Sequence, residues 1–241
     1  MKCDLHCHTA YSYDSASPPK EMVDAALKKG INCLAITDHG EIKGAREAIE
    51  YAKGKPILII PGIEIKSKEG DILALNIKEI IPNKLSAEET IKEIKEAGGL
   101  AIIPHPFGWL CSFKGDLEKI VKEIDGIEVL NASYFGGNKK ALIFAKKYGL
   151  SFTAGSDAHF SSFAGKCYLE ISGDNLSFEE ATASSLTSAK ASAIEKVLKK
   201  IKNREGKIGG SEANFFEKIL GYIKRSFAKI KHYAGRKKRK I

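Results

Sequence analysis

The sequence predicts an α/β fold, built on a parallel sheet or barrel, and two features of its 241 residues predict it. Short runs rich in β-branched residues alternate with helix-like stretches over most of the chain, an order typical of strand–helix–strand units. Polar clusters that contain histidine follow several of the strand-like runs, and α/β proteins place their chemistry at the carboxyl ends of strands. Hydrophobic residues make up 43% of the chain, an ordinary value for a globular domain.

Eight strands are expected in the body of the chain. Each is a short run in which β-branched and other apolar residues dominate. In order, they span residues 3–8, 31–37, 57–65, 72–77, 100–103, 127–130, 151–154 and 167–171. Their alternation with helices is the reason to expect a mostly parallel arrangement.

Six helices are expected along the same stretch, over residues 19–29, 43–54, 86–97, 116–123, 138–148 and 177–187. Ser17, followed by two prolines, is typical of a helix start. Ser86 and Ser177 each have a glutamate three residues later and resemble capping boxes. Glycines stand where four of the helices should end: Gly30, Gly54, Gly98 and Gly149.

The basic character of the chain is confined to its last segment. Residues 206–241 contain 11 of the 39 Lys and Arg residues and 2 of the 30 Asp and Glu residues, so they account for the whole formal net charge of +9. After the flexible stretch 206–210, apolar residues recur at helical spacing. We therefore expect a main domain over residues 1–205 and a basic amphipathic helical tail over residues 206–241.

The tail has three interpretations. Its helix could dock its apolar face on the body or on a second subunit, it could tether RNA or DNA, or it could lie on an anionic membrane surface. Because the net charge lies in the tail, any partner that is attracted by charge should meet the tail. The sequence does not set the number of subunits.

Features of the whole chain favour a cytoplasmic protein. The sequence has no stretch of about 18 apolar residues, so no transmembrane helix is expected. The N-terminal MKCDLHCH becomes polar too early for a secretory signal. The five cysteines are scattered and none forms a CxxC pair, a pattern that favours free thiols in a reducing compartment.

Histidines gather at the ends of the expected strands, where five of the six are found: His6, His8, His39, His105 and His159. In the first strand, the period of two places His6 and His8 on one face, where adjacent imidazoles can chelate a cation. Asp4 precedes them on the same face and could fix the tautomer of one imidazole. Each motif alone could be polar surface, a cap or a turn, but the five together predict a metal centre.

Carboxylates accompany these histidines and complete the candidate ligand set: Asp14, Glu64, Asp71 and Asp157. Asp38 precedes His39, and because strand side chains alternate, it should point away from His39 and support the ligands or cap a helix. Nitrogen and oxygen ligands without thiolates suit Mn, Fe or Zn, whereas Mg fits less well because it prefers sites made of oxygen alone.

The order of these motifs resembles the polymerase and histidinol phosphatase (PHP) family. DLHxHT, a downstream aspartate, TDHG, PGIE, HPF and GSDAH follow one another with the family's order and spacing over residues 1–190. The resemblance implies a distorted (β/α)7 barrel, which is a TIM-like fold, with two or three divalent metal ions in its site.

The resemblance also implies which residues hold each ion. The first ion would be held by His6, His8, Glu64 and Asp157. Glu64 would bridge to a second ion held by His105 and Asp71. The third ion would be held by Asp14, His39 and His159. Close relatives often have histidine where this chain has Asp71, and an aspartate there would favour a harder ion.

By the same resemblance, the chain should hydrolyse phosphate esters, with a small phosphomonoester or a nucleotide as substrate. A hydroxide bridging two ions would attack phosphorus, and Asp157 or His159 would give a proton to the leaving alkoxide. Residues expected to contact the substrate are Arg46, Asn131, Lys139 and Lys166. The alternatives are a nuclease that holds RNA or DNA with the tail, and a non-catalytic nucleic-acid-binding barrel. The complete ligand set argues against the last of these.

Aromatic residues surround His105 in the sequence. Phe107, Trp109 and Phe113 could pack the loop or form a stacking wall for a nucleobase. Tyr11 and Tyr13 pose the same choice in the first loop. Packing is the simpler interpretation of both groups.

Overall fold

The structure is a computed structural model that describes residues 1–109, 111–133, 137–172 and 175–179. The expected tail, 206–241, lies outside the described residues, and so does the greater part of the helix expected over 177–187. Among the described residues, no helix is long and apolar enough to span a membrane.

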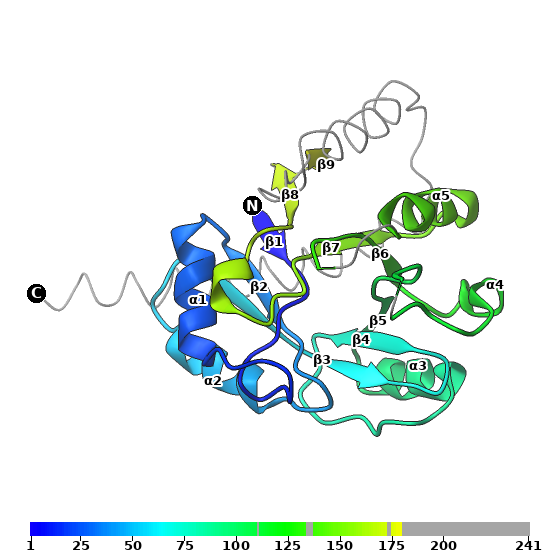
Figure 1. The fold of residues 1–241 in the computed structure, drawn as a ribbon, viewed down its shortest axis with the longest axis horizontal. Coiled ribbons are helices and arrows are strands. Elements are labelled where there is room, and N and C mark those ends of the chain that lie inside the picture. The colour runs from blue at the N-terminus through cyan, green and yellow to red at the C-terminus, as the bar shows by residue number, and fades with distance from the viewer. Residues whose placement is uncertain (110, 134–136, 173–174, 180–241) are drawn as a thin grey trace, which may run out of the picture.

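Within the described residues, nine strands form one sheet that wraps into a nearly closed barrel (Figure 1). The strands are β1 (Lys2–Asp4), β2 (Cys33–Ile36), β3 (Leu58–Lys66), β4 (Asp71–Leu75), β5 (Leu100–Ile103), β6 (Gly126–Asn131), β7 (Phe152–Gly155), β8 (Leu169–Ser172) and β9 (Asn175–Glu179). Their order is β7-β6-β5-β4-β3-β2-β1-β8-β9. Beyond β1, the Leu5 amide donates to the Ala154 carbonyl in β7 at 3.2 Å, which brings the two ends of the seven-strand barrel together.

One strand distorts the barrel. Strand β4 runs antiparallel to both β3 and β5, because the chain returns through a short turn after β3 and not through a crossover helix. The other pairs among β1 to β7 are parallel. Strands β8 and β9 continue the sheet past β1 as antiparallel additions. The predicted distorted barrel is therefore confirmed.

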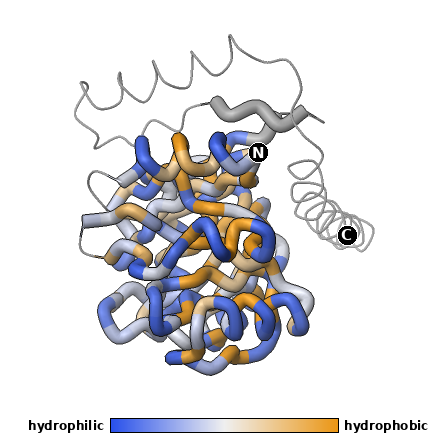
Figure 2. The backbone as a smooth tube through the Cα atoms, turned by 90° about the vertical axis from the view of Figure 1, so that its right-hand side faces the viewer, coloured by the Kyte–Doolittle hydropathy of each residue, from blue (hydrophilic) through white to orange (hydrophobic). Residues whose placement is uncertain are grey.

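Helices follow the strands and lie around the outside of the barrel (Figure 1). They are α1 (Pro19–Lys28), α2 (Lys43–Tyr51), α3 (Ala87–Glu96), α4 (Leu117–Ile120), α5 (Asn138–Tyr148) and the short 3-10 helix η1 (Ser161–Phe163). Each of α1 to α5 buries apolar side chains against the strands, and Figure 2 shows hydrophobic and hydrophilic stretches alternating along the chain.

Local signals in the sequence identify some helix ends correctly and others wrongly. The Ser86 capping box is present, since Ser86 accepts from the Glu89 amide and the Glu89 carboxylate accepts from the Ser86 amide. Ser17 does not cap α1; its hydroxyl accepts from the Ser161 amide at 2.9 Å, and Pro18 takes the cap position. Ser177 lies in β9, so the helix expected there is wrong over 177–179.

Four glycines stand beyond helix ends in the left-handed conformation, where L side chains are strained. Their φ angles are 74° for Gly30, 80° for Gly54, 73° for Gly98 and 60° for Gly149. The sequence therefore places these helix ends correctly.

The core has two layers. Inside the barrel lie small and branched side chains that include Cys3, Cys33, Leu73 and Ile102. A larger layer, which includes Met22 and Ile63, fills the space between the strands and the helices. All five cysteines are free thiols, as predicted, and each has more than half of its surface covered. These layers hold the strands rigid, so that the residues at their carboxyl ends keep fixed positions.

Candidate metal centre

The centre begins where β1 ends. The chain beyond Asp4 stays inside the barrel because the His8 amide donates to Ala158 at 2.9 Å and the Asp157 amide donates to His6 at 2.8 Å. These bonds turn both imidazoles inward, and their Nε2 atoms lie 3.1 Å apart. Both side chains are fully buried. His6 and His8 thus form the paired arrangement that a shared cation requires.

Glu64 lies at the middle of the centre, near the end of β3, and its two oxygens face different imidazoles. Oε2 lies 3.2 Å from His8 Nε2 and 3.3 Å from both His6 Nε2 and His39 Nδ1. Oε1 lies 3.2 Å from His105 Nε2. A carboxylate with one oxygen toward each of two groups of imidazoles is suited to bridge two cations.

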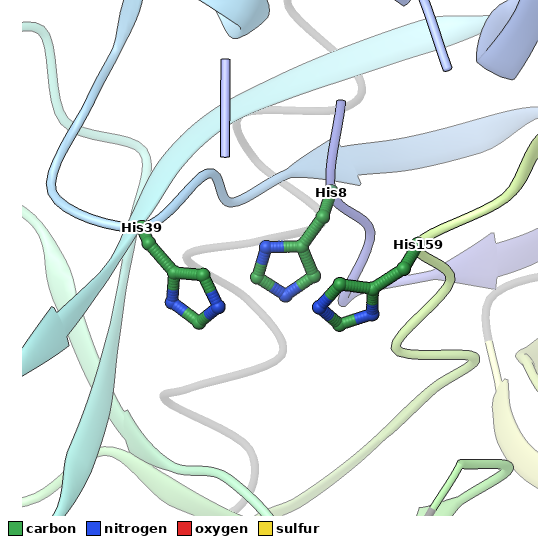
Figure 3. Close-up of side chains that lie close together, drawn as sticks. All are labelled: His8, His39 and His159. Atoms are coloured by element: carbon green, nitrogen blue, oxygen red, sulfur yellow. The ribbon is translucent and has the colours of Figure 1, made fainter. Parts of the chain in front are cut away.

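Asp157 and Asp14 complete the centre from opposite sides. Asp157 Oδ1 lies 3.3 Å from His8 Nε2 and 3.5 Å from His6 Nε2. Asp14 Oδ2 lies 3.2 Å from His39 Nε2 and 3.3 Å from His159 Nε2. Figure 3 shows the rings of His8, His39 and His159 turned toward a common space. We call the partly exposed side formed by Asp14, His39 and His159 the mouth of the centre.

In the part of the chain that the structure describes, three groups of side chains have ligand atoms within 4.8 Å of one another: His6, His8 and Asp157; His6, Glu64 and His105; and His8, His39 and His159. The first two groups are buried and the third lies partly at the mouth. Imidazole nitrogens and carboxylate oxygens without thiolates fit Mn, Fe or Zn. The residues present therefore fit divalent metal ions.

Eight of the nine predicted ligands meet in this arrangement, and Asp71 does not. Its carboxylate lies 3.2 Å from Lys66 Nζ, the residue opposite it in the β3–β4 pair. Among the described residues, the groups that could hold an ion do not include Asp71. Burial, followed by the charge of Glu64, raises the pKa of Asp71.

The protein alone holds a dense set of charges in this centre. Burial disfavours the imidazolium of His8, yet hydrogen bonds to Asp157 and Glu64 raise its pKa to about 9. Burial likewise disfavours the imidazolium of His6, but Asp157, Glu64 and Glu128 raise its pKa well above the ordinary value. Burial would raise the pKa of Glu64, but His6 and its neighbours lower it well below the usual range. An entering cation would therefore displace protons from the imidazoles.

Four of the five imidazoles have their Nδ1 atom held by a group behind the centre. Glu128 Oε1 lies 3.2 Å from Nδ1 of His6, and Ser12 Oγ lies 3.0 Å from Nδ1 of His8. The Cys111 carbonyl accepts a hydrogen bond from Nδ1 of His105 at 3.1 Å, and the Asp157 carbonyl accepts one from Nδ1 of His159 at 3.0 Å. A proton held on Nδ1 leaves the Nε2 lone pair free to bind a cation.

Sequence reasoning missed both Glu128 and Ser12. Glu128 leaves a signal, since a charged residue stands in the apolar strand GIEVLN and is 1% exposed. A buried carboxylate on a strand requires donors, and those donors lie at the nearby metal centre. Ser12 lies in a turn between Tyr11 and Tyr13 and leaves no signal of this kind.

Asp4 does not contact an imidazole ring nitrogen, and the expectation that it fixes a tautomer is wrong. Its carboxylate accepts from the amides of Ser156 at 2.8 Å and Gly165 at 2.7 Å, and from the Ser156 hydroxyl at 2.6 Å. The strand ends at Asp4, so the period of two does not continue to His6 and His8. Asp4 instead ties the chain after β7 to the end of β1.

Asp38 supports the centre indirectly, as expected of a residue that points away from His39. Its carboxylate accepts from the Thr9 amide at 2.6 Å, the Thr9 hydroxyl at 2.8 Å and the Ser12 hydroxyl at 2.9 Å. Ser12 in turn holds His8. Asp38 therefore orders the loop that carries two parts of the centre.

Three of the four residues expected to contact substrate have other partners. Arg46 donates to the Lys78 carbonyl at 2.7 Å, and Asn131 donates to Glu128 and Asp157 at 2.8 and 3.3 Å. Lys166 Nζ lies 3.3 Å from the centroid of the Phe163 ring. Lys139 is exposed in the first turn of α5. Of the four, only Asn131 contacts a residue of the centre.

The aromatic residues near the centre divide into two kinds. Phe107 and Phe113 pack against the core, as the simpler interpretation predicted. Trp109 is 85% exposed, and Tyr13 is 86% exposed while its ring stacks on His39 at 4.9 Å between centroids. Exposed rings at these positions are not explained by packing of the core.

Comparisons with known proteins agree with this architecture. The family model for the PHP domain matches residues 4–229. An uncharacterized protein of Methanocaldococcus jannaschii is 43% identical over 147 residues, 57% of this chain and 85% of the relative. A probable phosphatase of Caldicellulosiruptor saccharolyticus is 29% identical over 203 residues, 69% of this chain and 84% of the relative.

A solved structure shares the fold. It is a two-domain protein of Bacteroides vulgatus that contains a predicted PHP-like metal-dependent phosphoesterase, with a TM-score of 0.58 and 23% identity. The match covers 67% of this chain and 52% of that one, so this chain spans about half of the two-domain protein.

A nearly closed barrel with imidazoles and carboxylates gathered at its strand ends defines the class of protein as a metal-dependent hydrolase. The chain belongs to the PHP domain family, and the resemblance inferred from its motifs is confirmed.

Proposed function

We propose that this chain hydrolyses a small phosphate ester, a phosphomonoester or a nucleotide, in a centre of two or three divalent metal ions. The observation that carries the proposal is Glu64, whose two oxygens each lie 3.2 Å from the Nε2 of a different imidazole, that of His8 or that of His105. Such a bridging carboxylate would hold two ions close enough to act on one phosphoryl group.

The ligand set favours Mn, Fe or Zn as the resident ions. His6, His8, Glu64 and Asp157 would hold the first, and Glu64 and His105 the second. A third would lie at the mouth, held by Asp14, His39 and His159. Bound ions would supply a water of near-neutral pKa and positive charge beside the phosphoryl oxygens.

The protein's own residues divide the remaining work. Burial would raise the pKa of Asp157, but His6 and His8 lower it below its usual range, so this carboxylate stays ionised and is a poor proton donor. His159 lies at the mouth with Nδ1 on the Asp157 carbonyl, which directs Nε2 outward to Asp14. In a centre of two ions, His159 in its imidazolium form can give the Nε2 proton to the leaving alkoxide and keep the proton on Nδ1. In a centre of three ions, His159 serves as a ligand.

The substrate class is tested with the purified protein loaded with Mn, Mg or Zn. The panel contains phosphomonoesters, nucleoside bisphosphates and short oligonucleotides. Hydrolysis of a phosphomonoester or a nucleotide supports the proposal, and cleavage of oligonucleotides alone would assign a nuclease instead. If none of these compounds is hydrolysed, the result would favour a non-catalytic barrel.

The His8→Ala variant tests the centre itself. Because His8 Nε2 lies within 3.3 Å of both Glu64 and Asp157, we expect its loss to reduce bound metal and to lower turnover by at least about 100-fold. Metal content is measured by elemental analysis beside the activity. Wild-type metal content together with wild-type turnover would refute the metal centre.

We also propose that residues 206–241 tether the protein to a polyanion, in the cytoplasm. The segment's formal charge of +9 supports this. Binding to RNA and to anionic vesicles is compared for the full chain and for a chain that ends at residue 205. Loss of RNA binding alone, or of vesicle binding alone, identifies the partner. Equal binding by both chains would contradict the proposal and would favour a tail that docks on protein.

A further inference from the structure

Glu128 lies behind the metal centre and is 1% exposed, in the middle of β6. Three nitrogen atoms surround its carboxylate. Oε1 lies 3.2 Å from His6 Nδ1, and Oε2 lies 2.9 Å from the His105 amide and 2.8 Å from Asn131 Nδ2. Two of these nitrogens belong to residues of the centre, and the third belongs to a residue that also contacts the centre.

Two of these three partners are donors, and both contact the same oxygen, Oε2. The His105 amide and the Asn131 side-chain amide can only donate at these contacts. Oε1 therefore faces His6 Nδ1 alone, and where Oε1 accepts, the proton of that ring lies on Nδ1. His6 Nε2, on the side that faces Glu64 and Asp157, then has the lone pair that a bound cation would take.

The same carboxylate reaches a third part of the centre. Asn131 Nδ2 donates to Asp157 Oδ2 at 3.3 Å as well as to Glu128. The backbone makes room for this arrangement at Gly155, where an added Cβ would lie 2.3 Å from the His6 Cβ and 2.8 Å from Glu128 Oε1. Glu128 therefore joins the chain after β1, the chain after β5 and the chain after β7.

We propose that Glu128 is a positioning residue of the metal centre, which sets the tautomer of His6 and aligns His6, His105 and Asp157 for the two buried ions. This inference rests on the proposed function, because it concerns the residues that would hold those ions. Carboxylates behind a metal-binding histidine fix its ring orientation and increase its basicity, and their loss weakens metal binding by about 10- to 100-fold.

The Glu128→Gln variant separates this role from simple filling of space. Glutamine has nearly the same shape but only one acceptor oxygen. That oxygen goes to the side with two donors, the His105 amide and Asn131, so the NH2 group faces His6 Nδ1. His6 must then accept at Nδ1 and carry its proton on Nε2, where it blocks the cation.

The experiment measures the affinity of wild type and Glu128→Gln for Zn and Mn by competition with a chelator. We expect a dissociation constant raised by about 10- to 100-fold for the variant. Glu118→Gln removes the same charge from the exposed surface of α4 and serves as the matched control, with affinity unchanged. Wild-type affinity in Glu128→Gln would overturn the inference.

A second measurement does not depend on the variant. Nitrogen-15 NMR of the imidazoles in the Zn-loaded wild type should show His6 with its proton on Nδ1, and an unprotonated Nδ1 would overturn the inference even if the variant fails to fold. Failure of the proposed function has a different signature, because the wild-type protein would then bind no divalent ion or hydrolyse no phosphate ester.

Discussion

Ser12 holds His8 from behind, and its hydroxyl makes three hydrogen bonds. The hydroxyl accepts hydrogen bonds from His8 Nδ1 and from the His39 amide, both at 3.0 Å. It donates a hydrogen bond to Asp38 Oδ1 at 2.9 Å. This geometry orients the His8 ring through Nδ1 and at the same time fixes the backbone that carries His39. A single hydroxyl thus serves a ligand of the buried ions and a ligand at the mouth.

The Ser12→Ala variant should therefore bind metal more weakly. Alanine removes the acceptor at His8 Nδ1, so the ring loses its fixed orientation, and we expect the dissociation constant for Zn or Mn to rise by about 10-fold. Chelator competition measures it. Ser162→Ala, at an exposed position in η1, is the control and should match wild type. If Ser12→Ala and Ser162→Ala bind metal equally well, the hydroxyl does not position His8.

At the scale of elements, patterns that act locally predict the structure well. The strand runs and the helices over 19–148 appear near their expected places because apolar periodicity and glycine ends are properties of a few neighbouring residues. The β1 prediction is too long by four residues at its end, since β1 stops at Asp4 while the expected strand continues to residue 8. Beyond Asp4 the chain pairs with the segment after β7, which no local pattern reveals.

The parts of the site that depend on contacts between distant elements cannot be predicted from the sequence, whereas the ligands can. The ligands carry their own signal, because histidines recur at strand ends. Asp71 is a carboxylate at the start of β4, and it faces Lys66 across an antiparallel pair that only the fold defines. Glu128 contacts His6, 122 positions away, and Ser12 contacts Asp38, 26 positions away. Both roles depend on how the barrel brings side chains together.

The whole molecule is linked through the centre. Its side chains come from the loops after β1, β2, β5 and β7 and from β3 itself, so they approach from around the whole barrel. Cations bound there would join strands that the sheet connects only through intervening neighbours. The closure between β1 and β7 is narrow, with the Leu5–Ala154 bond and the bridge between Cys7 and Ala158, and His6, His8 and Asp157 lie beside it.

Removal of metal should consequently lower the stability of the folded chain. A ligand that binds only the folded state stabilises it by about 2.7 kcal/mol at a concentration 100 times its dissociation constant. For a protein of this size, each kcal/mol corresponds to about 2–4 °C in melting temperature, so we expect wild type with excess Zn or Mn to melt about 5–10 °C above the same protein in EDTA. Differential scanning calorimetry measures both states, and His8→Ala should show a smaller difference. Equal melting temperatures of the wild type with metal and with EDTA would contradict the idea that the cations join the barrel strands.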